Sequence, residues 1–339
     1  MSVVASGWEQ IVGHEWAVQL LSNAVNQDRV GHAYLITGPA NIGRTTLART
    51  FAQALNCTAD LEDRPCGECR SCRLIAADRH PDIRVLEPET TDRGTRSIKI
   101  EQIRNLQQDL NLSAYEARYK VAILRDFETA VPSAANAFLK TLEEPPANVV
   151  LLLTATDADR LLPTIASRCH TINLRPVAPT LIEETLMTTH RVEDNKARLL
   201  AHVADGRIGW AITAAENNDL LTGRNDQLDL LDKALATSRV GRFALAETLA
   251  KKPDHLLATL RIWLSWWRDV TLLTCGRLED EYVSNIDRQQ DLYAYSQQWT
   301  TQQVLRGLNR TDRAIWQIEH NANTRLVLEN MMLAYPLNK

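Results

Sequence analysis

Nine residues near the N-terminus have the composition and spacing of a loop that binds phosphate. An apolar run over residues 32–37 precedes the loop and a helical pattern over residues 47–55 follows it, so loop N–H groups and a helix N-terminus would face an anion. The pattern G-x-x-x-x-G-K-[ST] is matched except that an arginine replaces the lysine. The residues concerned are Gly38, Gly43, Arg44, Thr45 and Thr46.

Four of the six cysteines are crowded into residues 57–72, and they are Cys57, Cys66, Cys69 and Cys72. Four thiolates suit tetrahedral Zn²⁺, and the overlapping C-x-x-C steps are typical of a zinc site. Four protein ligands leave no open position for water, so we expect structural rather than catalytic zinc. Buried or redox-active cysteines are the alternative. Cys275 stands apart among apolar residues, and we expect it to fill a core.

Composition limits the classes of protein that fit. The chain has 339 residues, 45% of them hydrophobic, which is enough for two or three domains. A net charge of −4 excludes a globally basic nucleic-acid binder, so any DNA contact would use a local patch. No apolar run reaches the ~18 residues of a membrane span, and the N-terminus lacks signal-peptide features. These patterns predict a cytoplasmic protein.

Hydrophobic periodicity predicts an α/β region followed by an all-α region. Apolar runs alternate with helical patterns up to about residue 175, which indicates a parallel sheet with helices on both faces. Later residues show only helical periodicity. The expected strands are 32–37, 83–86, 120–124 and 149–154, and the expected helices between them include 47–55, 98–112 and 134–142. We therefore expect an α/β domain at 1–175 with the cysteine module at 57–72, a small helical domain at 176–222 and a helical domain at 223–339.

Three further segments carry a resemblance to a known family. They are Asn-Ala-Phe-Leu-Lys-Thr-Leu-Glu-Glu-Pro-Pro at 136–146, Leu-Leu-Leu-Thr-Ala-Thr at 151–156 and Leu-Leu-Pro-Thr-Ile-Ala-Ser-Arg-Cys at 161–169. A cysteine cluster follows the helix expected at 47–55, directly after the phosphate-binding loop, or P-loop. Together with that cluster, this series resembles the clamp-loader branch of the AAA+ ATPases, in particular the bacterial DNA polymerase III subunits. The resemblance implies an AAA+ P-loop domain, a lid domain and a C-terminal oligomerisation domain.

The same resemblance implies partners. They would be clamp-loader gamma/tau and delta subunits, the sliding clamp and, through the complex, primer–template DNA. No membrane partner is implied.

The resemblance also questions whether this chain hydrolyses ATP. Hydrolysing members have a lysine at the position of Arg44, an Asp-Glu pair where Arg125 and Asp126 stand, and a sensor arginine at the position of Gly209. A shifted register would offer Asp126 and Glu128 instead, but the spacing to the motif at 136–146 argues against it. Losing these positioned charges removes what phosphoryl transfer depends on, so we expect no intrinsic ATPase activity. Nucleotide binding at the altered loop is doubtful.

Ser167, Arg168 and Cys169 keep the family pattern. In clamp loaders this tripeptide offers its arginine to ATP on the neighbouring subunit, as an arginine finger. The resemblance therefore implies a non-catalytic subunit of the DNA polymerase III holoenzyme that completes its neighbour's active site. In the alternative interpretation, Arg168 merely pairs with a surface carboxylate.

Two other functions remain open. One is an ATP-hydrolysing motor subunit similar to gamma or tau, and the other is a free-standing zinc-containing DNA-binding module. The negative net charge and the lack of a basic stripe count against the module. Trp263, Trp266 and Trp267 have helical spacing, which favours a core or a subunit interface over base stacking. We expect the interface, because clamp loaders assemble through their C-terminal domains.

Overall fold

The computed structural model describes residues 7–90, 96–251, 253–276, 283–320 and 322–336. The chain forms two compact units. The first unit contains residues 1–192 and 206–210, and the second contains 193–205 and 211–339. These units do not divide at 175 and 222, and the three-domain division stays a prediction.

The first unit is built on a five-stranded sheet in which every pair of neighbours is parallel. The strand order is β2-β5-β6-β1-β7. Every residue of β1 and β6 is buried, as expected for a parallel sheet covered on both faces. The strands are β1 (Ala33–Thr37), β2 (Ile83–Leu86), β5 (Lys120–Leu124), β6 (Val149–Ala155) and β7 (His170–Asn173).

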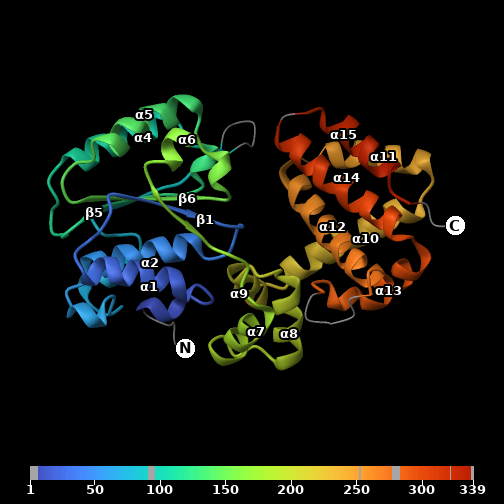
Figure 1. The fold of residues 1–339 in the computed structure, drawn as a ribbon, viewed down its shortest axis with the longest axis horizontal. Helices are drawn as coiled ribbons and strands as arrows, with labels where there is room; N and C mark the ends of the chain where they lie inside the picture. Colours follow the sequence, from blue (N-terminus) through green and yellow to red (C-terminus); the bar gives the residue numbers. More distant parts are fainter. Residues whose placement is uncertain (1–6, 91–95, 252, 277–282, 321, 337–339) are drawn as a thin grey trace. The chain divides into compact units, whose positions relative to one another are not determined.

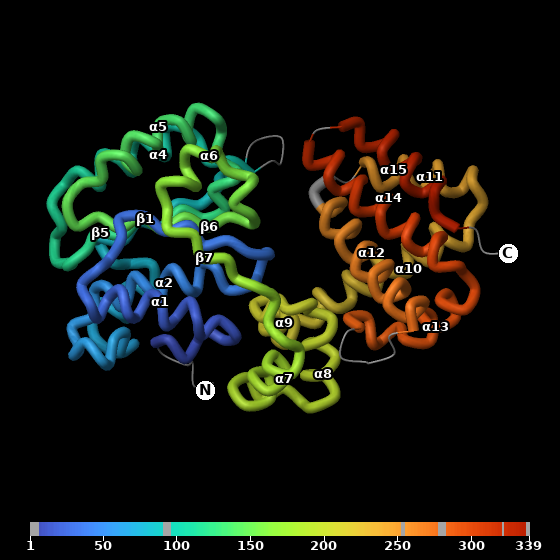
Figure 2. Tube along the Cα trace, in the orientation of Figure 1, coloured from blue at the N-terminus to red at the C-terminus, as the bar shows by residue number. Residues whose placement is uncertain are grey.

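Helices cover both faces of this sheet. Figure 1 shows α4, α5 and α6 on one face and α1 and α2 on the other, and the tube view in Figure 2 agrees. The predicted α/β architecture is therefore confirmed. The helices of this unit are η1 (Gly7–Gln10), α1 (Glu15–Asn26), α2 (Arg44–Asn56), η2 (Leu61–Asp63), α3 (Arg70–Ala76), α4 (Ile100–Asn111), η3 (Phe127–Thr129), α5 (Pro132–Glu143), η4 (Ala158–Arg160), α6 (Pro163–Ala166) and α7 (Pro179–Thr188).

Sequence patterns locate four of the five sheet strands and miss β7 and a short hairpin. In β7 only Ile172 is buried, so this edge strand is too short and too polar to give an apolar run. The hairpin pairs β3 (Glu89–Thr90) with β4 (Arg96–Ser97) inside a segment expected to be a loop. Residues 91–95 of that segment lie outside the described part of the chain.

In the described residues of the second unit, all regular secondary structure is helical. Its helices are α8 (Asp194–Val203), α10 (Asp219–Ala236), α11 (Arg239–Ala250), α12 (Pro253–Thr274), η6 (Ile286–Arg288), α13 (Gln289–Gln298), α14 (Thr301–Glu319) and α15 (Thr324–Leu333). Helix α9 (Ile208–Glu216) starts in residues assigned to the first unit and ends in the second. Among the described residues, no helix combines the length and the apolar character needed to cross a membrane.

The tryptophans of α12 lie in the core of the second unit. Trp263, Trp266 and Trp267 are at most 2% exposed, and the Trp266 and Trp267 rings meet edge to face at 5.0 Å. The expectation that they form a subunit interface is wrong, because α13, α14 and α10 of the same chain pack around α12. Cys275, expected in a core, is exposed just after this helix.

A buried guanidinium ties the end of the chain to α10 and α11. Arg242 is 1% exposed and donates hydrogen bonds only to carbonyl oxygens, among them those of Ala234, Met332 and Tyr335 at 2.8–2.9 Å. Further bonds reach the carbonyls of Leu235 and Pro336. Burial lowers the pKa of Arg242, as desolvation of a cation should.

Asp82, between α3 and β2, fixes the segment that leads into β5. This buried carboxylate accepts hydrogen bonds from the backbone N–H groups of Tyr115, Glu116 and Ala117 at 2.7, 2.8 and 2.9 Å. Burial acts to raise the pKa of Asp82, but these bonds outweigh burial and the pKa lies below its usual value. The Asp82 carboxylate thus accepts three backbone hydrogen bonds that carbonyl groups would accept in a helix or a sheet.

Asp82→Asn should lower the free energy of unfolding by about 2 kcal/mol at pH 7, because an amide satisfies these donors less well than a charged carboxylate. Since folding lowers the Asp82 pKa, its contribution is complete above the unfolded pKa of about 4 and is lost as pH falls through the folded value. Urea unfolding of both proteins from pH 7 to pH 2.5 measures this. A destabilisation that stays constant over the whole range would contradict it.

Candidate functional site

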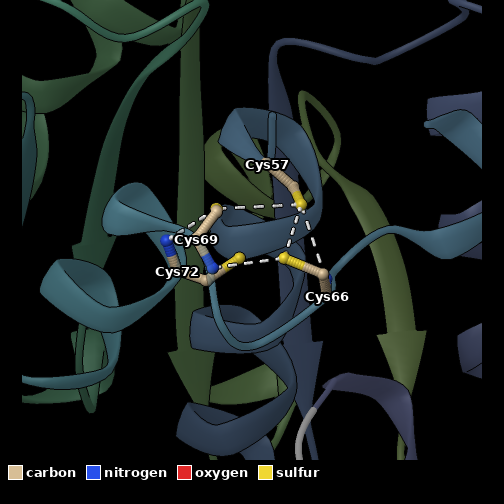
Figure 3. Close-up of side chains that lie close together, drawn as sticks. All are labelled: Cys57, Cys66, Cys69 and Cys72. Atoms are coloured by element: carbon tan, nitrogen blue, oxygen red, sulfur yellow. Dashed lines mark hydrogen bonds between the residues drawn. The ribbon is translucent and has the colours of Figure 1, made fainter. Parts of the chain in front are cut away.

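The four clustered cysteines converge on one point beside α2 and α3. Cys57 directly follows α2, Cys69 caps the start of α3, and Cys72 lies in that helix. All four Sγ atoms lie within 4.8 Å of one another, with 3.5 Å between Cys57 and Cys66 and 4.0 Å between Cys57 and Cys69 (Figure 3). A regular tetrahedron with Zn–S bonds of about 2.3 Å has edges of about 3.8 Å. The sulfurs therefore fit a tetrahedral ion such as zinc.

Backbone N–H groups surround the sulfurs with positive potential. Those of Cys66, Cys69 and Cys72 donate to the Sγ atoms of Cys57, Cys66 and Cys69, at 3.3–3.4 Å. Burial acts to raise the pKa of Cys69, but hydrogen bonds from Thr58 and Cys72 lower it to about 6. Burial raises the pKa values of Cys57 and Cys72. A dication among the sulfurs would deprotonate all four thiols.

The cysteine module is bonded to the helix that follows the glycine loop. Gln53 of α2 donates from Nε2 to the Cys72 carbonyl at 2.9 Å. Trp8 of η1 donates from Nε1 to the Arg64 carbonyl at 2.9 Å. A bound ion would thus hold the C-terminal end of α2 to α3 and to the N-terminal segment.

The glycine loop joins β1 to α2 with a backbone that needs its glycines. Gly38 and Gly43 have φ angles of 143° and 112°, which residues with a Cβ atom rarely adopt. A Cβ atom at Gly38 would also lie 2.7 Å from the Leu174 carbonyl oxygen. Ile42 is buried, and its carbonyl accepts a hydrogen bond from His14 at 3.2 Å. Thr45 and Thr46 follow in the first turn of α2. The strand, loop and helix predicted from the sequence are all present.

Arg44, the departure from the P-loop pattern, has a partner 82 residues away. Its Nη2 lies 3.1 Å from Asp126 Oδ1, and its side chain is 8% exposed. Asp126 follows the end of β5 at φ 48°, and its N–H donates to Thr154 Oγ1 on β6 at 3.0 Å. The Arg44 Nη1 is buried and has no hydrogen-bond partner among the described residues. Sequence reasoning singled out both charged residues but not their contact.

The charged residues next to Asp126, Arg125 and Glu128, bind other partners. Arg125 forms an ion pair with Glu87, beyond the end of β2. Glu128 Oε1 accepts the Thr156 N–H at 2.9 Å. The position that corresponds to the family's metal ligand therefore carries a cation engaged with a carboxylate.

Gly209 lies directly against the glycine loop. Its N–H donates to the Asn41 carbonyl at 2.9 Å. A Cβ atom at position 209 would lie 2.9 Å from the same oxygen, so any side chain here would have to displace the loop. Two of the three positions that differ from hydrolysing relatives therefore meet at the loop. Arg44 binds Asp126, and Gly209 contacts Asn41.

Arg168 lies after α6, with its guanidinium partly exposed. Nη1 donates to the Thr164 carbonyl at 2.8 Å, and Nη2 lies 2.7 Å from Glu143 Oε1 at the end of α5. Ser167 Oγ donates to the same carbonyl at 3.4 Å. Burial raises the pKa of Cys169 to about 12, so that thiol is neutral. Glu143 is 25 residues away in the sequence, and the sequence analysis indicated no particular carboxylate as the partner of Arg168.

Comparison with known proteins gives concordant matches. Residues 13–178 match the family described as DNA polymerase III, delta subunit. The delta' subunit of Bacillus subtilis is 28% identical over 319 residues, which cover 93% of this chain and 94% of that protein. The delta' subunit of Pseudomonas aeruginosa is 42% identical over 156 residues, 46% of this chain and 47% of that protein.

Other matches are shorter or less similar. The tau subunit of Escherichia coli is 33% identical over 63% of this chain, which spans only 34% of tau. Among solved structures, a Thermotoga maritima gamma subunit-related protein has a TM-score of 0.44 at 20% identity, covering 94% of this chain and 97% of its own. Thermotoga maritima RuvB, a Holliday junction branch migration motor, has a TM-score of 0.45 at 16% identity, covering 67% of each chain.

A covered parallel sheet with a glycine loop after β1, together with a helical C-terminal region, defines a P-loop protein of the AAA+ class. Within that class the chain belongs to the clamp-loader family of DNA polymerase III subunits.

The cysteine geometry predicts about one equivalent of zinc per purified chain, measurable by elemental analysis. Cys69→Ser should lose the metal and lower the Tm, since a tetrahedral ion would link α2 to α3. Cys275→Ser is the matched control, because that cysteine is exposed and lies outside the cluster. Metal-free wild-type protein with an unchanged Tm would refute the zinc site.

Proposed function

We propose that this chain is a delta-prime-like, non-catalytic subunit of the DNA polymerase III clamp loader. In this role it helps load the sliding clamp onto primed DNA, in a cytoplasmic complex with gamma/tau and delta subunits. It supplies Arg168 to the ATP of a neighbouring subunit. The observation that carries the proposal is the contrast between Arg44, paired within the chain, and Arg168, which keeps the family pattern at the surface.

Charge at the glycine loop supports an inactive site. A P-loop lysine reaches the β- and γ-phosphates of ATP, but the Arg44 guanidinium is already bonded to Asp126. Magnesium would need an acidic ligand where Arg125 stands, and a cation there repels the metal. The contact of Gly209 with Asn41 leaves no room for a sensor arginine at that position. Each difference removes positive charge or metal from the place where phosphoryl transfer needs it.

The loop retains features that favour an anion. Its glycines keep the backbone geometry, and the buried Nη1 of Arg44 has no hydrogen-bond partner among the described residues. Nucleotide binding without hydrolysis is therefore compatible with the proposal, whereas the alternative, a gamma/tau-like motor, requires Mg²⁺-dependent turnover.

The ion pair of Arg168 is compatible with a role in trans. The two side chains are 35% and 51% exposed, and exposed ion pairs contribute about 0–1 kcal/mol. A phosphate that arrives with a neighbouring subunit can therefore replace Glu143 at little cost. Meanwhile the Thr164 carbonyl still orients the guanidinium.

Arg168→Ala should reduce turnover at the neighbouring ATP site by about 10³-fold, the usual contribution of an arginine finger. The measurement is the single-turnover ATPase rate of the reconstituted complex. Glu143→Gln is the matched control, because it breaks the same ion pair and keeps the arginine. If both variants lower the rate equally, the pair is structural and the finger role is refuted.

The isolated chain should show no ATP turnover, and Mg²⁺ should not strengthen any nucleotide binding, since Arg125 replaces the metal ligand. Calorimetric titration of ATP with and without Mg²⁺, together with a phosphate-release assay, tests both expectations. Micromolar Mg-ATP affinity with turnover would support the motor subunit instead.

A further inference from the structure

Helix α14 of the second unit presents a row of arginines to solvent. Arg306, Arg310 and Arg313 are four and three residues apart, which places them on one helix face. All three are exposed, while Val304 and Thr311 on the opposite face are buried. With a rise of 1.5 Å per residue, the backbone positions of the three arginines follow the helix axis at steps of about 6 and 4.5 Å.

These three guanidinium groups have no hydrogen bond or ion pair with any residue that the structure describes. Other arginines of the same unit differ, since Arg224 and Arg288 each bind an aspartate. Like charges at i,i+3 and i,i+4 destabilise a helix. The row therefore costs stability and forms no internal ion pair in the described residues that would offset the cost.

An exposed aromatic platform continues the same helix face. Trp316, one turn after Arg313, is 59% exposed. His320 stacks on it with ring centroids 4.2 Å apart and donates from Nδ1 to the Trp316 carbonyl at 2.7 Å. This neighbour fixes the indole in place. The buried tryptophans of α12, by contrast, cannot reach a ligand.

We propose that this face of α14 binds single-stranded DNA, with Arg306, Arg310 and Arg313 on successive phosphates and Trp316 stacked on a base. A regular row of unpaired positive charge complements a polymer whose negative charge repeats along the strand. An exposed aromatic ring beside such a row is the combination that single strands use, because every base has a face to stack. The expectation that the chain lacks a basic stripe is wrong at this helix.

This surface goes beyond the role in a neighbour's ATP site and does not depend on it. Arg168 belongs to the first unit and α14 to the second, so variants of each can be measured separately.

Binding is measured on the full chain by fluorescence anisotropy with labelled oligo-dT of about 20 nucleotides, over a range of salt concentrations. The triple variant Arg306→Gln, Arg310→Gln, Arg313→Gln should bind at least tenfold more weakly. The slope of log K against log salt should fall by about 2, because each single-strand phosphate contact contributes about 0.7. The matched control changes Arg29, Arg79 and Arg104 to Gln, exposed arginines with no ion pair in the described residues, and should bind like wild type.

Stacking is tested at Trp316. Trp316→Ala should weaken oligo-dT binding about fivefold or more, and Trp316→Phe should retain most of it, since a smaller ring still stacks. A duplex of the same length should bind more weakly, because paired bases cannot stack on a side chain. Thermal melts of each variant check that the helix is intact.

The proposal is overturned if the wild-type chain does not bind oligo-dT, or if the triple variant and its control bind equally. Equal affinity for duplex and single strand would overturn the stacking role of Trp316. If DNA binding is unchanged in the triple variant while its affinity for clamp-loader subunits falls, the row is a protein-binding surface and the DNA assignment is wrong.

Discussion

Parallel pairing of β5 with β6 and of β6 with β1 is the constraint on which the site depends. It brings the carboxyl ends of three strands to one edge of the sheet, and each strand delivers one group there. The glycine loop follows β1, Asp126 follows β5, and Thr154 lies near the end of β6. Because the registers are fixed, Thr154 can accept the Asp126 N–H, and that bond holds the carboxylate toward Arg44. The same edge would serve nucleotide chemistry with other side chains.

In the Arg44–Asp126 pair, the positive charge of the arginine at this edge of the sheet is neutralised by a carboxylate of the same chain. Hydrolysing P-loop proteins place a lysine, a metal ion and acidic ligands where the phosphates arrive. Here cation and anion are both protein groups, and the arginine side chain is almost fully buried. Asp126 is partly exposed, but removal of its carboxylate would leave the Arg44 guanidinium as a desolvated and unpaired charge. The loop geometry and the ion pair therefore support each other, even without a ligand.

Local signals in the sequence predicted local features well. The strands with continuous apolar runs, the helix after the glycine loop and the cysteine cluster all depend on residues near in sequence, and the structure has them. Contacts between distant segments were out of reach, as with Arg44 and Asp126 or Arg168 and Glu143. Helical spacing indicated that the α12 tryptophans share one helix face, but it did not indicate what covers that face. In the structure, helices of the same chain cover it. Helical spacing in the sequence would also have placed the α14 arginines on one face, whereas their exposure and their lack of partners among the described residues come only from the structure.

The carbonyl partners of Arg242 have a consequence for the end of the chain. Three of the five oxygens around this buried cation belong to Met332, Tyr335 and Pro336. No described carboxylate neutralises the guanidinium, so these carbonyl dipoles supply much of its solvation. The carbonyl groups of Met332, Tyr335 and Pro336 thus take the place of water around the Arg242 guanidinium, which lies 90 or more residues earlier in the sequence. Loss of these residues would therefore leave Arg242 a buried cation with only the Ala234 and Leu235 carbonyls as partners among the described residues.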